Sequence, residues 1–442
     1  MNAESAPPQA PYARLMSTPA YARVFTAGLG STLGSGISAV CLVWLVFEST
    51  GSALDVAFLG SSWLVAGIVF SVFGGTLVDR YDRRRLMIVS DVARALAMGI
   101  VVVVLEVHGF DLVTVLSAYF VVGAFSTVFN PAEQALVPAL VELPLVADAN
   151  GLVRSSRSAA QFVGTSIGGA LIVTVGAVAG VAANALTFAV SALLLFGMSV
   201  PAQTVLRRAG WAGYLTDVRE GFRWLAKATG FLQLTISATF FNFCMSVVST
   251  FIVVFVTILL HGSGLVFALL LALEVAGTGL GSLLVSRTRG VRYAGRSWTI
   301  GAGAASGVVA VFLALFPSVP VAAVCLFWIG LFSGYAGTAW LTAAQLLVPS
   351  EMQGRYFGID ALGSIAIIPA AQIGGALLID AYGIEPTYLW VAVLWVVVGV
   401  IFLFPRALAE LGYPPRENPS VTPRSADAAP GTRESPEGSR AG

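Results

Sequence analysis

Apolar residues occupy most of the chain in long continuous runs, and short polar connectors separate the runs. Each run reaches about 20 residues, the length that a helix needs to cross the hydrocarbon core of a bilayer. The runs lack the period-two alternation of a transmembrane barrel strand, and a backbone in lipid must satisfy its own hydrogen bonds. We therefore predict twelve membrane-spanning helices, at 22–47, 54–77, 86–106, 112–131, 156–176, 178–200, 231–258, 263–285, 297–316, 319–346, 356–379 and 384–404.

The composition of the chain supports a membrane protein. Of its 442 residues, 57% are hydrophobic and 11% are charged, whereas soluble domains carry roughly 25% charged residues. Such a chain has too little polar surface for a water-soluble fold. The three cysteines, Cys41, Cys244 and Cys325, lie far apart within apolar runs. We expect them to be small buried hydrophobic side chains rather than a disulfide set or a metal site.

The distribution of lysine and arginine predicts the orientation of the spans. All 24 basic residues fall in the N-terminal segment, in or beside the connectors that follow even-numbered spans, or in the C-terminal tail. The remaining connectors contain no lysine or arginine. Since positive charge favours the cytosolic side, we predict a multi-pass protein of the plasma membrane with both termini in the cytosol. The opposite connectors carry Glu48, Asp55, Glu106, Asp111, Asp380 and Glu385.

The two halves of the sequence repeat. Three segments of the first half recur in the second at nearly one offset, pairing 76–80 with 283–287, 132–138 with 343–349, and 166–173 with 372–379. Two six-helix halves related by an axis along the membrane normal form a transporter architecture. The predicted organisation is a cytosolic segment (1–20), a first half (21–200), a cytosolic linker (201–230), a second half (231–405) and a disordered cytosolic tail (406–442), which is rich in proline, serine and arginine.

The connector after the second span reads GGTLVDRYDRRR, at residues 74–85, and it resembles the signature of the major facilitator superfamily. Asp82 stands where that signature has glycine, and aspartate is one of the few residues that tolerates a left-handed turn. Residues 90–96, 129–141, 149–171 and 348–359 resemble the drug-efflux branch of the superfamily, which includes macrolide and tetracycline exporters and the enterobactin exporter. The matching residues of the signature are Gly75, Leu77, Asp79, Arg80, Arg83 and Arg84.

The resemblance implies that Asp79 and Arg80 help to lock the halves together when the transporter is open outward. Asp79 could meet the N-terminus of the eleventh span, where the helix dipole favours an anion. The alternative is that this connector only sets the orientation, for which Asp79 is not needed. The predicted cytoplasmic gate or latch consists of Gly75, Asp79, Arg80, Arg83, Arg84, Asp91, Arg94, Arg154 and Asp360.

Two of these positions suggest pairing. Asp91 and Arg94 lie three residues apart on one helix face. We expect either that they pair or that Arg94 extends to the cytosolic surface, and in both cases a mainly structural role. Asp360 is a candidate partner for an arginine of the 74–85 connector or for Arg154, and the sequence does not choose between them.

Glu274 lies about 11 residues from the outer end of the eighth span, which is about 16 Å deep at 1.5 Å per residue. A charge at that depth costs at least ~2.5 kcal/mol. We therefore expect the carboxyl group to face a wet cavity, to pair, or to be protonated. It is either a proton-coupling or cation-binding site, or a neutral side chain hydrogen-bonded between helices.

Further residues are candidates to line a central substrate path, and each has an alternative role in packing between helices. Glycine-rich segments at 28–36 and 277–282 permit close contact between helices. The sequence contains no phosphate-binding loop, and its two histidines lie in outer connectors, so we expect neither ATP-driven transport nor catalysis. The cavity candidates are Asn242, Tyr335, Trp340, Gln345 and Gln372.

These observations predict an all-α membrane transporter that is not an enzyme. The resemblance adds export of small amphipathic compounds, by alternating access in exchange for protons. Its partners would be the substrate, protons and the lipid bilayer, without nucleic acid, metal or cofactor, and we expect a monomer. Two alternatives stay open: a dedicated exporter of one metabolite such as a siderophore, and a non-transporting sensor or scaffold on the same fold.

Overall fold

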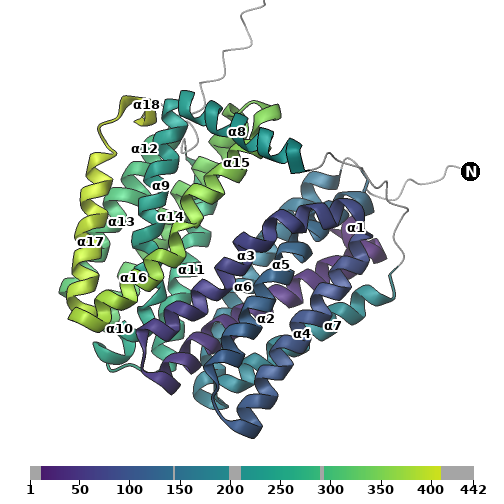
Figure 1. The fold of residues 1–442 in the computed structure, drawn as a ribbon, viewed down its shortest axis with the longest axis horizontal. Helices are drawn as coiled ribbons and strands as arrows, with labels where there is room; N and C mark the ends of the chain where they lie inside the picture. Colours follow the sequence, from purple (N-terminus) through teal and green to yellow (C-terminus); the bar gives the residue numbers. More distant parts are fainter. Residues whose placement is uncertain (1–10, 143–144, 199–210, 289–292, 410–442) are drawn as a thin grey trace, which may run out of the picture.

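The computed structural model describes residues 11–142, 145–198, 211–288 and 293–409, and every regular element in those ranges is a helix (Figure 1). The N-terminal half contains α1 (Pro11–Ser17), α2 (Pro19–Thr50), α3 (Ala53–Arg80), α4 (Arg83–His108), α5 (Leu112–Leu140), α6 (Val146–Thr174) and α7 (Ala177–Phe196). The linker helix α8 (Trp211–Lys227) leads to α9 (Thr229–Thr250), α10 (Ile252–Ile258), α11 (Gly264–Arg287), α12 (Ala294–Ser297), the π-helix η3 (Trp298–Ala305), α13 (Ser306–Leu315), α14 (Val319–Leu347), α15 (Ser350–Ile365), α16 (Ile367–Tyr382), α17 (Ile384–Ile401) and α18 (Arg406–Ala409).

The described part of the chain contains twelve membrane-length segments at the predicted positions. Three of them combine several elements: α9 with α10, α12 with η3 and α13, and α15 with α16. Eleven segments are long and apolar enough to cross a membrane by length and composition. The remaining one is α6, which carries Arg154 and Arg157 and packs against α2 and α11. A membrane helix tolerates such polar residues where neighbouring helices or a wet cavity receive them.

The fourth span differs from its prediction. The sequence placed its end at residue 131, but α5 continues through Pro131 and Pro138 to Leu140. Membrane helices tolerate proline because neighbouring groups can satisfy the freed backbone. Glu133, which the prediction left in a connector, therefore lies inside a helix.

The eleventh span is broken where its sequence requires a break. Pro369 has no N–H group, and its ring clashes with the carbonyl group four residues earlier. That carbonyl belongs to Ile365, at which α15 ends, and α16 begins at Ile367.

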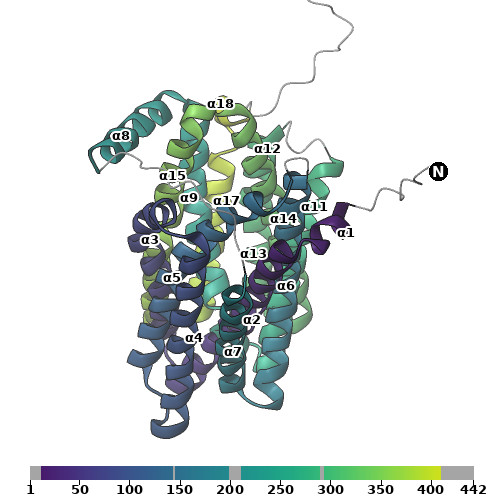
Figure 2. The ribbon, with the colours of Figure 1, turned by 90° about the vertical axis from the view of Figure 1, so that its right-hand side faces the viewer.

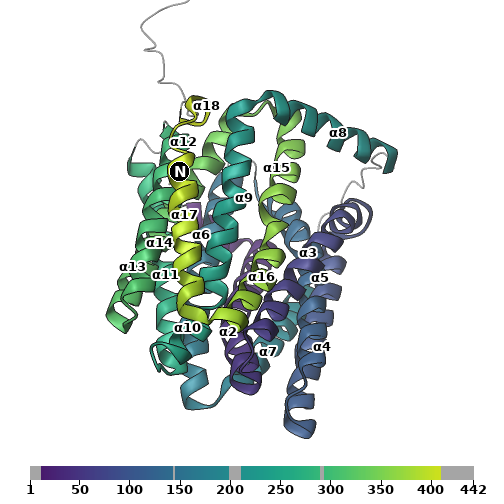
Figure 3. The same ribbon diagram turned by 60° about the vertical axis from the view of Figure 1, so that its left-hand side comes forward.

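The helix contacts confirm the internal duplication. Within the first half α3 packs against α5, α2 against α7 and α4 against α7, and the corresponding pairs α11–α14, α9–α17 and α13–α17 pack in the second half. Figures 2 and 3 show the two bundles from the side. Glycines bring α11 close to α14, since a Cβ atom at Gly277 or Gly281 would strike the backbone of α14. The predicted close contact at 277–282 is therefore confirmed.

The two ends of the bundle differ in charge. We call the end with the start of α4 (Arg83–Arg85), α8 and α12, which carries Arg296, the arginine-rich end. We call the opposite end, with the connectors at 51–52, 109–111, 259–263 and 316–318, the arginine-free end. In Figure 1 the two halves converge toward the arginine-free end and diverge toward the end that carries α1 and α8.

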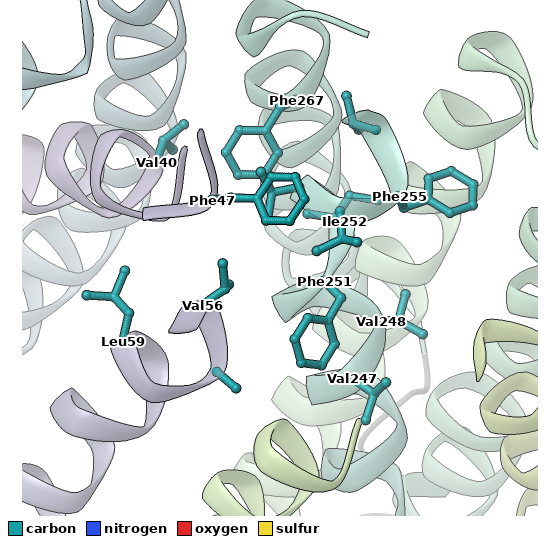
Figure 4. Close-up of a cluster of buried hydrophobic side chains, with 14 of the residues drawn as sticks. Val40, Phe47, Val56, Leu59, Val247, Val248, Phe251, Ile252, Phe255 and Phe267 are labelled. Carbon is teal, nitrogen blue, oxygen red and sulfur yellow. The ribbon is translucent and has the colours of Figure 1, made fainter. Parts of the chain in front are cut away.

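A large apolar cluster joins the halves near the arginine-free end. Phe47 of α2 and Val56 of α3 face Phe251, Ile252 and Phe267 of the second half (Figure 4). The contacts between halves run along two corresponding helix pairs, α3 with α16 and α6 with α11. Burial of apolar surface in this cluster stabilises the contact between the halves.

Candidate functional site

A polar cavity of about 360 Å³ lies within the N-terminal half. Serine and threonine side chains of α2 form one wall, and two guanidinium groups reach it from α4 and α6. The cavity therefore offers many hydrogen-bonding groups, among them two guanidinium groups that are each paired with a carboxylate. Its lining includes Ser31, Thr32, Ser35, Ser38, Arg94, Asn130, Arg157, Gln161 and Asn184.

Asp91 and Arg94 form the ion pair that the sequence predicted. Arg94 donates through Nη2 to Asp91 Oδ1. The Asp91 side chain is 0% exposed and the Arg94 side chain is 4% exposed. Ser191 of α7 donates a second hydrogen bond to Asp91, at 2.5 Å. The guanidinium carbon lies 4.3 Å and 4.5 Å from the ring centroids of Phe129 and Phe188, within the range of cation–π attraction. Arg94 is thus held by Asp91 of its own helix and by side chains of α5 and α7, and its part in a gate stays a prediction.

Glu133 and Arg157 form a second ion pair, which the sequence reading missed. Arg157 of α6 donates through Nη2 to Glu133 Oε2, and Glu133 is 2% exposed. Gly28 of α2 leaves room for the carboxylate, because a Cβ atom there would strike it. The internal repeat contained a signal for this acid. Glu133 aligns with Ala344 when the two halves are compared, so the carboxyl group is present in the first half and absent from the equivalent position of the second.

Arg83 and Arg84 of the 74–85 connector donate hydrogen bonds to backbone carbonyl groups of their own half. Arg84 donates to Leu195 O at 2.8 Å, and Arg83 donates to Ala135 O at 2.9 Å. Arg23 joins Arg84 at the end of α7 with a 2.6 Å bond to Gly197 O. Cations near unpaired carbonyls stabilise a helix C-terminus.

Asp82 corrects one sequence interpretation. It has φ −59°, outside the left-handed region, and it caps α4 by accepting a 2.8 Å hydrogen bond from Arg85 N. Aspartate is favoured here as an N-cap rather than as a substitute for glycine. The side chains of Gly75, Asp79 and Arg80 lie outside the described residues, so their predicted role as a latch stays a prediction.

A second cavity, of about 540 Å³, lies within the C-terminal half. Its walls are mainly apolar and include five aromatic side chains, with contributions from α9, η3, α14, α15, α16 and α17. Two residues predicted to line a substrate path, Asn242 and Trp340, do line it. We call it the aromatic pocket; its lining includes Phe241, Asn242, Met245, Trp298, Ser333, Trp340, Phe357, Asp360, Ser364 and Trp395.

Asp360 lies at the wall of the aromatic pocket and is 5% exposed. Its Oδ1 accepts a 2.7 Å hydrogen bond from the Thr235 hydroxyl of α9. Arg154, one of its suggested partners, is exposed on α6 in the other half. The structure thus places Asp360 within a substrate-sized cavity of its own half, and its pairing with an arginine stays a prediction.

Glu274 of α11 is partly buried among the helices of the C-terminal half. Its Oε1 accepts a 3.0 Å hydrogen bond from the Ser249 hydroxyl, one residue before the end of α9. The break between α9 and α10 therefore lies beside this carboxyl group. A hydroxyl donor satisfies either charge state of a carboxyl group, since it adds no fixed charge.

The other three cavity candidates have different surroundings. Gln372 of α16 joins the halves, because its Oε1 accepts a 2.9 Å bond from Ser61 of α3 and its amide donates to Thr250 at 3.1 Å. Tyr335 bonds to Thr288 at 2.7 Å, at the end of α11. Gln345 is exposed near the arginine-rich end of α14.

Cysteine and metal chemistry is simple in the described part of the chain. Cys41, Cys244 and Cys325 are buried free thiols, as predicted. The described residues contain no group of three or more His, Cys, Asp and Glu side chains that could hold a metal ion.

Comparisons with known proteins identify the fold and the kind of protein. The model of the Major Facilitator Superfamily matches residues 24–371. The multidrug efflux pump Tap of Mycolicibacterium fortuitum is 28% identical over 88% of this chain and 96% of its own length. The staphyloferrin A transporter of Staphylococcus aureus is 20% identical, over 84% of this chain and 92% of its own.

Solved structures agree with this fold. The nucleoside transporter NupG, as a D323A mutant, superposes with a TM-score of 0.72 over 86% of this chain and 98% of its own, at 11% identity. A bacterial homologue of the lysosomal transporter Spinster, inward-facing and unoccupied, superposes with a TM-score of 0.67 over 90% and 99%, at 12% identity. These likenesses confirm the fold, and the sequence relatives are transporters rather than enzymes.

Proposed function

This chain belongs to the major facilitator superfamily, and we propose that it exports small amphipathic compounds from the cell by alternating access in exchange for protons. The chain is a multi-pass membrane transporter. Export as the direction is supported by the Tap efflux pumps, which are similar over most of their length. The plasma membrane, with the arginine-rich end in the cytosol, is the location that the positive-inside rule favours.

The observation that carries this proposal is the pairing of one closed end with two internal cavities. Apolar contacts join the halves near the arginine-free end, while each half holds its own cavity. One cavity is polar and the other is aromatic, which suits a substrate with a polar part and an apolar part. In our proposal this arrangement is the state that loads substrate from the cytosol, and rocking of the halves would expose the same groups outward.

Glu274 is our candidate for proton coupling. Asp91 and Glu133 each have an arginine partner, so protonating either would leave a buried or partly buried guanidinium unpaired, at a cost in free energy. The bond from Ser249 to Glu274 carries no such penalty. An intramembrane acid of this kind is a functional candidate by default.

We also retain the latch. Asp79 and Arg80 would hold the halves together at the arginine-rich end when the opposite end is open. Arg154, which is exposed on α6, and Asp360 are available to face one another across the halves in that state. In this proposal Asp360 changes partner during the cycle.

Efflux measurements test the export proposal. Cells with and without the gene are loaded with a panel of amphipathic dyes and antibiotics, and retention is followed with and without a protonophore. We expect protonophore-sensitive loss of several compounds in the expressing cells only. Equal retention in both strains for every compound would refute export.

A dedicated metabolite exporter is the second candidate. The similarity to a staphyloferrin A transporter supports it, and the hydroxyl, amide and guanidinium donors of the polar cavity could bind the oxygen atoms of a siderophore. The same panel, extended with ferric and iron-free siderophores, separates the candidates: a dedicated exporter moves one compound and leaves the dyes in place. A sensor or scaffold would move none.

A further inference from the structure

The aromatic pocket has the dimensions and lining of a ligand site. Its volume of about 540 Å³ lies in the range of small-molecule pockets, roughly 300–1,000 Å³. Five aromatic side chains, Phe241, Trp298, Trp340, Phe357 and Trp395, contribute to the wall, and only a few polar groups converge on it. This composition favours flat or aryl-substituted ligands.

The rings of this pocket are held in place before any ligand arrives. Trp298 contacts Trp340 with ring centroids 6.1 Å apart, and Trp340 contacts Phe357 at 6.2 Å. The indole N–H of Trp298 donates to Ser237 at 3.0 Å, and that of Trp395 donates to Ala302 O at 2.9 Å. Protein groups already satisfy these two indole donors, so a ligand would meet these side chains as apolar and π surface, and π faces attract cations.

Asp360 is the acidic side chain in the lining of this pocket. Its carboxylate is buried, and its hydrogen bond comes from a neutral hydroxyl, that of Thr235. Among the described side chains it has no ion-pair partner, whereas the buried acids of the first half, Asp91 and Glu133, are each paired with arginine. A buried carboxylate without a counter-charge is costly, so a cation that entered the pocket would relieve that cost.

We propose that the aromatic pocket binds aryl-substituted organic cations, with the positive centre at Asp360 and the aryl groups against Trp298, Trp340 and Phe357. This inference rests on the proposed function and names the substrate class for it. Asn242 and Ser364 form part of the polar wall of the site. Asn242 Nδ2 donates to Ser364 O at 2.8 Å, and this bond holds the Asn242 side chain at the wall. The polar part of a larger substrate would extend toward the other half.

Equilibrium binding tests this assignment without transport. The full-length protein in lipid nanodiscs is titrated with radiolabelled tetraphenylphosphonium, and triphenylphosphine oxide serves as a neutral compound with the same aryl groups. We expect the cation to bind at least tenfold more tightly than the neutral compound. Asp360→Asn should lower the affinity for the cation at least tenfold and leave that for the neutral compound within twofold. Asp360→Glu should retain the preference for the cation.

A matched control comes from Asp380, which is exposed at the arginine-free end of the same half. Asp380→Asn should bind tetraphenylphosphonium like the wild type, and Trp340→Leu should weaken both compounds. The assignment is overturned if Asp360→Asn binds the cation as well as the wild type does. It is also overturned if the wild type does not prefer the cation, or if Asp360→Asn weakens both compounds equally.

The outcome is separable from that of the export proposal. Preserved cation binding together with no efflux of any compound would refute export and leave the pocket assigned. Efflux of neutral compounds together with no selective cation binding would leave export standing and overturn the pocket.

Discussion

Ser61 of α3 donates a 2.9 Å hydrogen bond to Gln372 Oε1 of α16, so one buried polar contact ties the two halves together beside the apolar cluster. Gly60 makes this approach possible, because a Cβ atom there would lie 2.7 Å from Gln372 Nε2. The contact lies on one of the two helix pairs that join the halves. A substitution that removes this bond therefore tests whether it helps to hold the halves together at the arginine-free end.

We expect Ser61→Ala to favour opening of that end. A lost hydrogen bond is worth about 1 kcal/mol, which shifts a two-state equilibrium roughly fivefold. Spin labels at the exposed positions Val175 and Tyr382, in a cysteine-free background, report the separation by electron–electron resonance. Ser62→Ala is the control, since Ser62 bonds to Leu59 O of its own helix. An unchanged distance distribution in Ser61→Ala would contradict a role in closure.

Glu274→Gln should uncouple transport from the proton gradient. The amide keeps a hydrogen bond to Ser249 but cannot take up a proton in exchange for substrate. In proteoliposomes we expect at least a tenfold loss of pH-driven accumulation, with downhill substrate exchange retained. Glu106→Gln, at an exposed position near the arginine-free end, should behave like the wild type. Full pH-driven transport in Glu274→Gln would exclude Glu274 as the coupling site.

The Glu133–Arg157 pair should appear in a double-mutant cycle. Glu133→Gln and Arg157→Gln each leave a charged partner without its counter-charge, so each should lower the melting temperature in detergent. The double variant should lose less than the sum of the two, with a coupling of about 1–3 kcal/mol. Strictly additive losses would show that the pair does not interact in solution.

The α11–α14 contact should respond to a single methyl group. Gly281→Ala places a Cβ atom against Leu331 O of α14, and overpacking of this kind costs about 1–3 kcal/mol. Gly279 lies on the same helix, and a Cβ atom there would meet nothing within 4 Å. Gly279→Ala should therefore leave the stability unchanged or raise it slightly, because alanine favours helix. Melting temperatures of the two variants check this, and equal values would refute the close contact.

Asp79→Ala tests the latch. Membrane insertion should be unchanged, because acidic residues contribute little to orientation, while the transport rate should fall at least tenfold as cycling is impaired. Asp82→Asn is the matched control in the same connector, since asparagine caps a helix as well as aspartate does. Transport at the wild-type rate in Asp79→Ala would refute the latch.

Local patterns predicted most of the fold correctly. Twenty-residue apolar runs gave the number and order of the spans because lipid leaves helices as the available form. The boundary of α5 was wrong, because the tolerance of a membrane helix for Pro131 depends on its neighbours rather than on its own sequence. Because the predicted span ended at residue 131, Glu133 was assigned to a connector and was not recognised as a buried acid. Its ion pair with Arg157 was missed for the same reason.

The sequence alone determined the spans, the separation of charge between the two ends and the duplication, because each is a property of residue order and composition. It also predicted the Asp91–Arg94 pair, since three residues along a helix make neighbours on one face. Only the tertiary structure decided which distant residues meet: Thr235 with Asp360, Ser249 with Glu274, and Ser61 with Gln372. Those meetings depend on how twelve helices pack, and packing is set by the shapes of all their faces at once.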